Sequence, residues 1–135
     1  DGIRDTSVTG VQTCALPIYD IMVNSNSDRI RQVFDNLISN AIRYSERGKI
    51  SIVIEDDKEE YLFFVSDTGS GINEESLSRI FERFYRTEDA RTKFRKGTGL
   101  GLPIVKHIIE AHNSSINVDS VEGKGTTFSF ALMKS

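Results

Sequence analysis

One long amphipathic segment constrains the fold of this chain more than any other feature of its sequence. Its apolar residues recur at helical spacing, at Ile30, Val33, Phe34, Leu37, Ile38, Ala41 and Ile42. Asn26 or Ser27 can cap the start of such a helix. The pattern therefore predicts one helix over residues 28–44.

Runs of alternating apolar and polar residues, typical of half-buried strands, come in two pairs. Residues 49–54 and 61–66 lie on either side of an acidic turn at 55–60. Residues 115–120 and 126–133 are joined by a short turn that contains two glycines. We expect two strand hairpins.

Two shorter helices are expected, over residues 74–81 and 99–111. Residues 87–97 lie between them, are rich in charge and poor in apolar side chains, and are expected to form a mobile loop. This order of elements favours an α+β fold. We expect a two-layer sandwich in which helices cover one face of a mixed, mostly antiparallel sheet.

Composition restricts the function. At 135 residues, with 38% hydrophobic and 27% charged residues, the chain suits one compact domain. The net charge of −3 argues against a nucleic-acid surface, which needs clustered Lys and Arg. Cys14 is the only cysteine, which excludes an internal disulfide and a cysteine-based zinc cluster. No apolar stretch approaches the roughly 20 residues that cross a bilayer, so we expect no direct membrane insertion of this fragment.

The first residues show neither helical nor strand periodicity. Residues 8–18 resemble the translated sequencing-adapter read-through that is found at the ends of metagenomic reading frames. We expect residues 1–17 to be a non-native or disordered leader and residues 18–135 to form the domain. The alternative is an ordinary N-terminal strand or linker.

Polar residues border the apolar face of the first predicted helix. Asn36, Asn40 and Arg43 fall within about 60° of one another around the helix axis. Asparagine is a mediocre helix former, so two of them beside a core need a reason. An amide oxygen that binds Mg²⁺ would supply one. The alternative is that both make only local hydrogen bonds.

Two glycine-containing segments also suggest chemistry. Asp67 follows a predicted strand directly and is itself followed by Gly69 and Gly71. The two glycines would let the backbone approach a flat ligand closely. The carboxylate could then accept a hydrogen bond from an exocyclic amine of that ligand. A plain turn is the alternative. The segment Gly97-Thr98-Gly99-Leu100-Gly101 precedes a helix whose N-terminus could hold phosphates, although this spacing alone is weak evidence.

The chain between the two glycine-containing segments includes an aromatic stretch that ends at the charged loop. Phe81 and Phe84, three residues apart, are expected to be core contacts. Arg86 at the root of the loop could match phosphate oxygens bidentately, although a solvated arginine is the default.

The order of these segments resembles the catalytic and ATP-binding domain of bacterial sensor histidine kinases. Residues 36–44 resemble the N box, 67–71 and 97–101 the two glycine boxes, and 81–84 the F box of that family, and the resemblance covers residues 18–133. It implies the Bergerat fold, with ATP and Mg²⁺ as cofactors and the charged loop as the ATP lid.

Residue roles follow from the resemblance by position. It implies that Asn40 is the Mg²⁺ ligand, that Asn36 and Arg86 are catalytic, and that Asp67 reads adenine. The remaining cofactor-binding positions that it implies are Arg43, Tyr44, Gly69, Gly71, Ile72, Gly97, Thr98, Gly99, Leu100 and Gly101.

The resemblance also indicates the type of reaction. Relatives that hydrolyse ATP efficiently carry a glutamate base four residues before the metal-binding asparagine, whereas this chain has Asn36, which has no useful basicity. We therefore expect this chain to transfer the γ-phosphoryl group to a histidine on its own dimerisation and phosphotransfer domain. A response regulator would be an indirect partner. The resemblance also implies that the chain is a cytoplasmic domain of a parent protein that is anchored in the inner membrane.

Two other functions remain open at this point. One is a nucleotide-binding regulatory or protein-interaction module without catalysis, which would use exposed aromatic residues at Phe84 and Tyr85 to dock a partner. The other is a hydrolytic ATPase of the same superfamily, which Asn36 disfavours. His107 and His112 are not candidates for the phosphorylated histidine.

Overall fold

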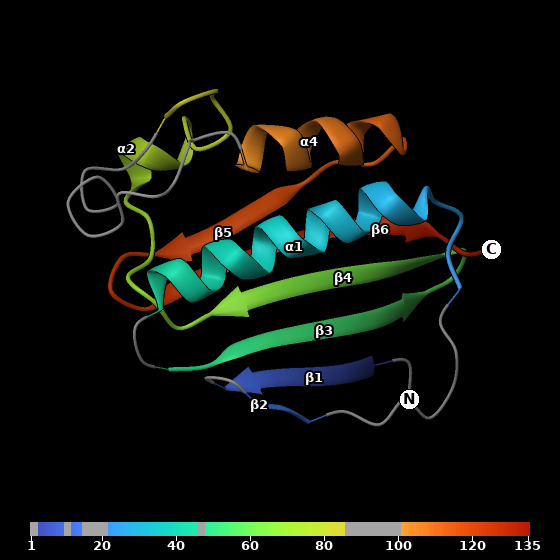
Figure 1. Ribbon diagram of the computed structural model, residues 1–135, viewed down its shortest axis with the longest axis horizontal. Helices are drawn as coiled ribbons and strands as arrows, with labels where there is room; N and C mark the ends of the chain where they lie inside the picture. Colours follow the sequence, from blue (N-terminus) through green and yellow to red (C-terminus); the bar gives the residue numbers. More distant parts are fainter. Residues whose placement is uncertain (1–2, 10–11, 15–21, 46–47, 86–100) are drawn as a thin grey trace.

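The computed structural model describes residues 3–9, 12–14, 22–45, 48–85 and 101–135. These residues form two layers, with helices on one face of a six-stranded sheet (Figure 1). The predicted α+β sandwich is therefore confirmed. Every strand pair in the described part of the chain is antiparallel, so the sheet is not mixed there as the sequence suggested.

Helix α1 (Ser27–Tyr44) agrees with the predicted helix to within one residue. Asn26 is its cap, because its side-chain oxygen accepts a hydrogen bond from the Arg29 amide at 3.1 Å. Four residues at helical spacing on the inner face are buried, namely Ile30, Val33, Leu37 and Ala41. The periodicity of the sequence thus predicted the face that packs on the sheet.

The first hairpin consists of β3 (Ile50–Asp57) and β4 (Glu60–Asp67). Its turn contains only Lys58 and Glu59, and Lys58 has a left-handed φ of 54°. The acidic residues that were expected to form a long turn instead extend both strands. Carboxylates on the exposed face of a strand keep their water, so acidity alone does not end it.

The second hairpin consists of β5 (Asn117–Val121) and β6 (Gly125–Met133). The strand order is β2-β1-β3-β4-β6-β5, so β6 pairs with β4 and the hairpin closes that side of the sheet. As a result, the turn between β5 and β6 lies beside the end of β4, where the predicted adenine-binding residue lies.

Helix α4 (Gly101–Ala111) follows the undescribed residues 86–100, and α2 (Glu74–Leu77) is shorter than the predicted helix over 74–81. After Leu77 the backbone continues in turns with i to i+3 hydrogen bonds, and these turns bury Ile80. None of the helices in the described ranges is long and apolar enough to cross a membrane.

The backbone near the N-terminus forms strands β1 (Ile3–Thr9) and β2 (Gln12–Cys14), and β1 pairs with β3. A strand edge such as that of β3 offers unpaired amide and carbonyl groups that another segment can satisfy. Residues 1–17 thus include two strands. That these residues are a non-native or disordered leader stays a prediction.

A cluster of aromatic rings fixes α1 on the sheet. Phe63 of β4 and Phe130 of β6 stack with ring centroids 5.3 Å apart, and Phe34 of α1 lies 5.7 Å and 5.6 Å from them. This packing aligns the elements so that the C-terminal end of α1, the end of β4 and the start of α4 meet at one end of the molecule (Figure 1).

Candidate functional site

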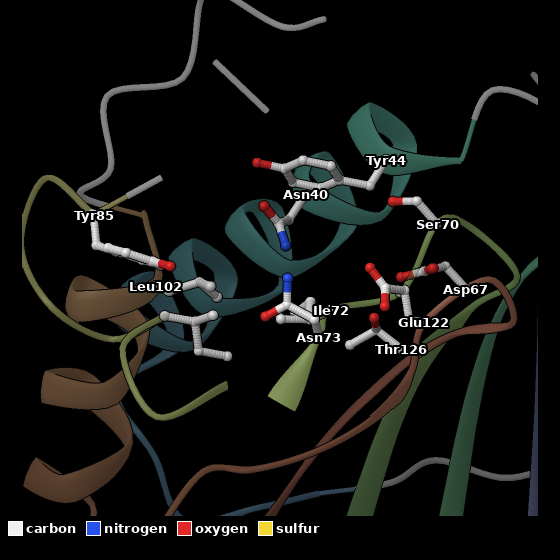
Figure 2. A pocket seen from close by; sticks show the side chains of 12 residues that line it. Asn40, Tyr44, Asp67, Ser70, Ile72, Asn73, Tyr85, Leu102, Glu122 and Thr126 are labelled. Carbon is white, nitrogen blue, oxygen red and sulfur yellow. The ribbon is translucent and has the colours of Figure 1, made fainter. Parts of the chain in front are cut away.

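A cleft opens at the end of the molecule where these elements meet. Its walls come from α1, from the segment that follows β4, from the start of α4 and from the turn between β5 and β6 (Figure 2). The lining residues are Asn40, Tyr44, Asp67, Ser70, Gly71, Ile72, Asn73, Ile80, Tyr85, Leu102, Glu122 and Thr126.

Two of the residues predicted on α1 lie in this cleft, Asn40 and Tyr44. The Asn40 side chain is half-buried and points toward Asn73 across the opening (Figure 2). Among the described residues it has no hydrogen-bond partner. A half-buried amide that the described residues leave unpaired suits a ligand or a metal ion, because such groups are normally satisfied.

Asp67, the last residue of β4, lies in the same cleft. Burial raises the pKa of its carboxyl above the ordinary value, and the hydrogen bond that it accepts from the Gly69 amide at 2.9 Å opposes this rise. Glu122 and Thr126 lie at the same end of the cleft (Figure 2). This end therefore combines two carboxyl groups with a buried hydroxyl.

The glycines that follow Asp67 are required by close contacts between backbone segments. A Cβ atom on Gly69 would lie 2.3 Å from the Tyr44 carbonyl oxygen, and one on Gly71 would lie 2.2 Å from that of Val121. Gly71 also has a φ of 72°, which favours glycine. In the structure these glycines let the backbone approach the protein itself, and their approach to a ligand stays a prediction.

A half-buried serine, Ser120, holds this segment on the neighbouring hairpin. The Ile72 amide donates a hydrogen bond to the Ser120 hydroxyl oxygen at 2.7 Å, and that hydroxyl lies 3.0 Å from the Gly125 carbonyl oxygen and 2.8 Å from the Thr126 hydroxyl. The loop after β4 and the β5–β6 hairpin are thus joined through one side chain. The lining residues Gly71 and Ile72 depend on this join.

Asn36 connects two of the predicted motifs without lining the cleft in the described residues. Its amide donates to the Gly101 carbonyl oxygen at 3.5 Å, the outer limit of a hydrogen bond, at the start of α4. Arg43 is half-buried and Gly69 is packed against α1, and neither lines the cleft.

The aromatic segment before residue 86 is only partly a core element. Phe81 packs edge-on against Phe128 with centroids 6.4 Å apart, as expected. Phe84 is 62% exposed and has a φ of 66°, so it is not the core contact that its spacing suggested. Tyr85 is half-buried and donates to the Ser76 hydroxyl at 2.9 Å, so its ring is not an exposed docking surface.

Several predicted residues cannot be placed. Those outside the described residues are Arg86, Gly97, Thr98, Gly99 and Leu100, together with the predicted loop at 87–97. Their roles stay predictions. Tyr85, which precedes these residues, lines the cleft, and Gly101, which follows them, is the first residue of α4.

Sequence reasoning missed seven lining residues: Ser70, Asn73, Ile80, Tyr85, Leu102, Glu122 and Thr126. Asn73 carried a local signal, since it caps α2 by accepting from the Ser76 amide at 2.8 Å and two glutamates follow it. Glu122 and Thr126 carried none. They reach the cleft only because β6 pairs with β4.

Comparison with known proteins identifies the family to which the fold and the cleft belong. The family model described as "Histidine kinase-, DNA gyrase B-, and HSP90-like ATPase" matches residues 25–135. The sensor histidine kinase WalK of Bacillus subtilis (strain 168) is 47% identical over 120 residues, which are 87% of this chain and 20% of WalK. The chain thus spans about a fifth of the length of the curated relatives it matches.

Solved structures agree with the fold. The nucleotide-free catalytic domain of histidine kinase ThkA matches with a TM-score of 0.69 and 38% identity, over 83% of this chain and 71% of that domain. Full-length ShkA in complex with AMPPNP matches with a TM-score of 0.71 and 28% identity, over 86% of this chain and 24% of ShkA.

Proposed function

This chain belongs to the histidine kinase-, DNA gyrase B- and HSP90-like ATPase family as a catalytic domain of the histidine kinase type, and we propose that it binds Mg²⁺-ATP and donates the γ-phosphoryl group to a histidine on a separate helical domain. The observation that carries the proposal is that Asn40 and Asp67, identified from separate motifs, line one cleft.

The charges around the cleft favour one orientation of the nucleotide. Asp67 and Glu122 lie at the same end, where like charge would repel a triphosphate (Figure 2). Leu102, in the first turn of α4, lines the cleft, and the positive end of a helix dipole attracts phosphate. We therefore assign adenine to the Asp67 end and the phosphates to the α4 end.

The Asp67 carboxylate would select the base. It can accept a hydrogen bond from the exocyclic amine of adenine, whereas guanine presents a carbonyl oxygen at that position and would be repelled. The Gly69 amide holds the carboxylate in place at 2.9 Å, so the acceptor is oriented before the nucleotide arrives.

The Asn40 amide, which has no hydrogen-bond partner among the described residues, fits a Mg²⁺ site with one protein ligand, since Mg²⁺ takes oxygen ligands and uses phosphates for much of its coordination. When bound, the ion neutralises charge on the phosphates during transfer. Asn36 cannot act as a base toward water, which supports transfer rather than vigorous hydrolysis. Arg86, by its position in the sequence, would contact the γ-phosphate.

The cell context is part of the proposal. The curated relatives are sensor proteins of which this chain spans about a fifth, and the remaining length would supply the histidine-bearing dimerisation domain. From that domain the phosphoryl group would pass to a response regulator. We propose a cytoplasmic location for this domain within a parent protein anchored in the inner membrane.

Phosphoryl transfer can be tested with labelled ATP and a helical-hairpin domain that carries the acceptor histidine. The Asn40→Ala variant is expected to lose transfer, while the Ser39→Ala variant, which changes an exposed neighbour on α1, is expected to keep it. ATP binding that depends on Asp67, without any transfer, would reject the catalytic role.

ATP binding without transfer would favour a second candidate function, a nucleotide-binding interaction module without catalysis. Phe84 is the observation behind it, because a 62% exposed phenylalanine held at a left-handed φ suggests a contact with a partner. An Asn40→Ala protein that retains its biological effect would support this module over the kinase.

A further inference from the structure

The face of the sheet that points away from the helices carries an apolar stripe. Side chains alternate along a strand, and Phe63 and Val65 are buried under α1 and α4, so Leu62 and Phe64 point to the opposite face. Val53 stands opposite Phe64, and Ala131 stands opposite Leu62. None of these four packs against the core beneath the helices.

The stripe continues to Met133, which is 50% exposed and stands opposite Glu60 on the same face. It runs diagonally over β3, β4 and β6, a width of about 10 Å, which is the diameter of a helix. Along the strand direction it extends from Phe64 to Met133, which stands level with Glu60. Four residue steps of about 3.4 Å give a length of about 14 Å, which matches roughly nine residues of helix.

The two borders of the stripe differ in charge. On one side are Glu55, Asp57 and Glu60, which stand next to one another by register. Among the side chains that the structure describes, Glu55 and Glu60 form no ion pair, and Asp57 interacts only electrostatically with Lys134, which pairs with Asp56 on the helix side of β3. On the other side are the hydroxyls of Ser66 and Ser129. Only a partner that is cationic along one flank would match this pattern.

We propose that this outer face of the sheet docks a cationic amphipathic helix of another domain or protein. The helix would place its apolar residues on Leu62, Phe64 and Met133 and its Lys or Arg residues against the three carboxylates. A second copy of this chain is disfavoured as the occupant, because its carboxylates would face those of the first copy.

The docking can be tested with a fluorescent helical peptide of roughly 18 residues, long enough to be partly helical, with a leucine stripe, lysines along one flank and glutamines elsewhere. The variant Glu55→Lys/Glu60→Lys is expected to bind this peptide about tenfold more weakly. It should bind the matching peptide that has glutamates in place of lysines more tightly than the unaltered protein does.

The control variant is Glu75→Lys/Glu110→Lys, which changes the net charge by the same amount at exposed positions on α2 and α4. It is expected to change affinity for the lysine peptide by less than about twofold. Equal weakening in both double variants would show a general charge effect and would overturn the proposal.

The apolar part of the surface is tested separately with the Phe64→Ser variant. This variant should bind the lysine peptide about tenfold more weakly, while circular dichroism and ATP-analogue binding show that its fold is intact. The proposal would also be overturned if the unaltered protein failed to bind the peptide. Sedimentation that shows a dimer of this chain, dissociated by Phe64→Ser, would overturn it as well by identifying a second copy as the occupant.

Discussion

Asp67 combines a cost in stability with the proposed recognition of adenine. Burial raises the pKa of its carboxyl in the folded chain, so the folded state holds the proton more tightly than the unfolded state does. The ionised carboxylate therefore lowers the free energy of unfolding at neutral pH. As the pH falls through the raised pKa toward the ordinary value, this cost disappears.

The Asp67→Asn variant tests both properties. Its side-chain oxygen can still accept from the Gly69 amide, so we expect a urea midpoint at about pH 7 equal to or above that of the unaltered protein. That advantage should shrink as the pH is lowered through the raised pKa of the native carboxyl, where it takes up its proton. ATP should bind at least about tenfold more weakly by calorimetry, because a charge-assisted acceptor is lost. Unchanged ATP affinity would show that the base binds elsewhere.

Two glycines with similar backbone angles separate conformational strain from close packing. Gly71 has a φ of 72° and Gly123 a φ of 84°, but only at Gly71 would a Cβ meet a backbone oxygen, at 2.2 Å. Around Gly123 there is nothing within 4 Å. Alanine at Gly123 should cost about 1 kcal/mol, the ordinary penalty for a left-handed residue.

Alanine at Gly71 should cost about 3 kcal/mol or more, because the loop must also move away from the Val121 carbonyl. It should weaken ATP binding as well, since Gly71 lines the cleft. Urea unfolding and calorimetric titration measure the two effects. Equal losses of stability in the two alanine variants would mean that the loop shifts without cost and that the close contact is unimportant.

Among the elements, the contact between the loop after β4 and the β5–β6 hairpin depends most on a single side chain. Replacing Ser120 by alanine removes the acceptor of the Ile72 amide and a partner of the Thr126 hydroxyl. Leaving such groups unpaired costs about 1–3 kcal/mol. We expect the Ser120→Ala variant to lose that much stability in urea unfolding and to bind ATP several-fold more weakly.

Ser66→Ala is the matched control, since it removes a hydroxyl pair with Thr127 at 2.9 Å on the opposite face of the sheet. It should cost about 0.5–1.5 kcal/mol and leave ATP affinity unchanged. If both serine variants bound ATP as the unaltered protein does, the join at Ser120 would have no role in shaping the cleft.

The sequence predicted elements well wherever local signals determine them. The helix α1 was found from its apolar spacing and its cap at Asn26, which are local properties. The length of α2 was overestimated because Leu77, Ile80 and Phe81 keep helical spacing, although Ile80 and Phe81 pack on the core from a series of turns. The ends of β3 and β4 were misjudged at the acidic residues around their turn, because pairing between the two strands determines where each strand ends.

The site could be predicted only in the parts that carry their own motif. Asn40 and Asp67 stand out in the sequence because each residue type is unusual in its position, beside a helix core and at a strand end. Thr126 is an ordinary strand residue by sequence. Its place in the cleft follows from the insertion of β6 between β4 and β5, a long-range pairing that no local pattern reveals.

At the scale of the whole molecule, the residues that line the cleft come from segments that meet at one end, and the cluster of three aromatic rings packs α1 on the sheet. A ligand that binds in the cleft contacts α1, the loop after β4, the start of α4 and the β5–β6 turn together. Binding should therefore stabilise the domain as a unit. The free energy gained depends only on the ratio of ligand concentration to Kd.

Thermal unfolding of the unaltered chain measures this linkage. At an ATP concentration about 100 times Kd, with Mg²⁺, the gain is about 2.7 kcal/mol. That gain should raise Tm by roughly 10 °C in a domain of 135 residues. At the same concentration, the tenfold weaker Asp67→Asn variant should gain about half as much, and GTP should give a much smaller shift than ATP because Asp67 repels its carbonyl oxygen. A similar rise in Tm with ATP and GTP would mean that phosphate contacts alone hold the nucleotide, and that the carboxylate at the end of β4 does not select the base.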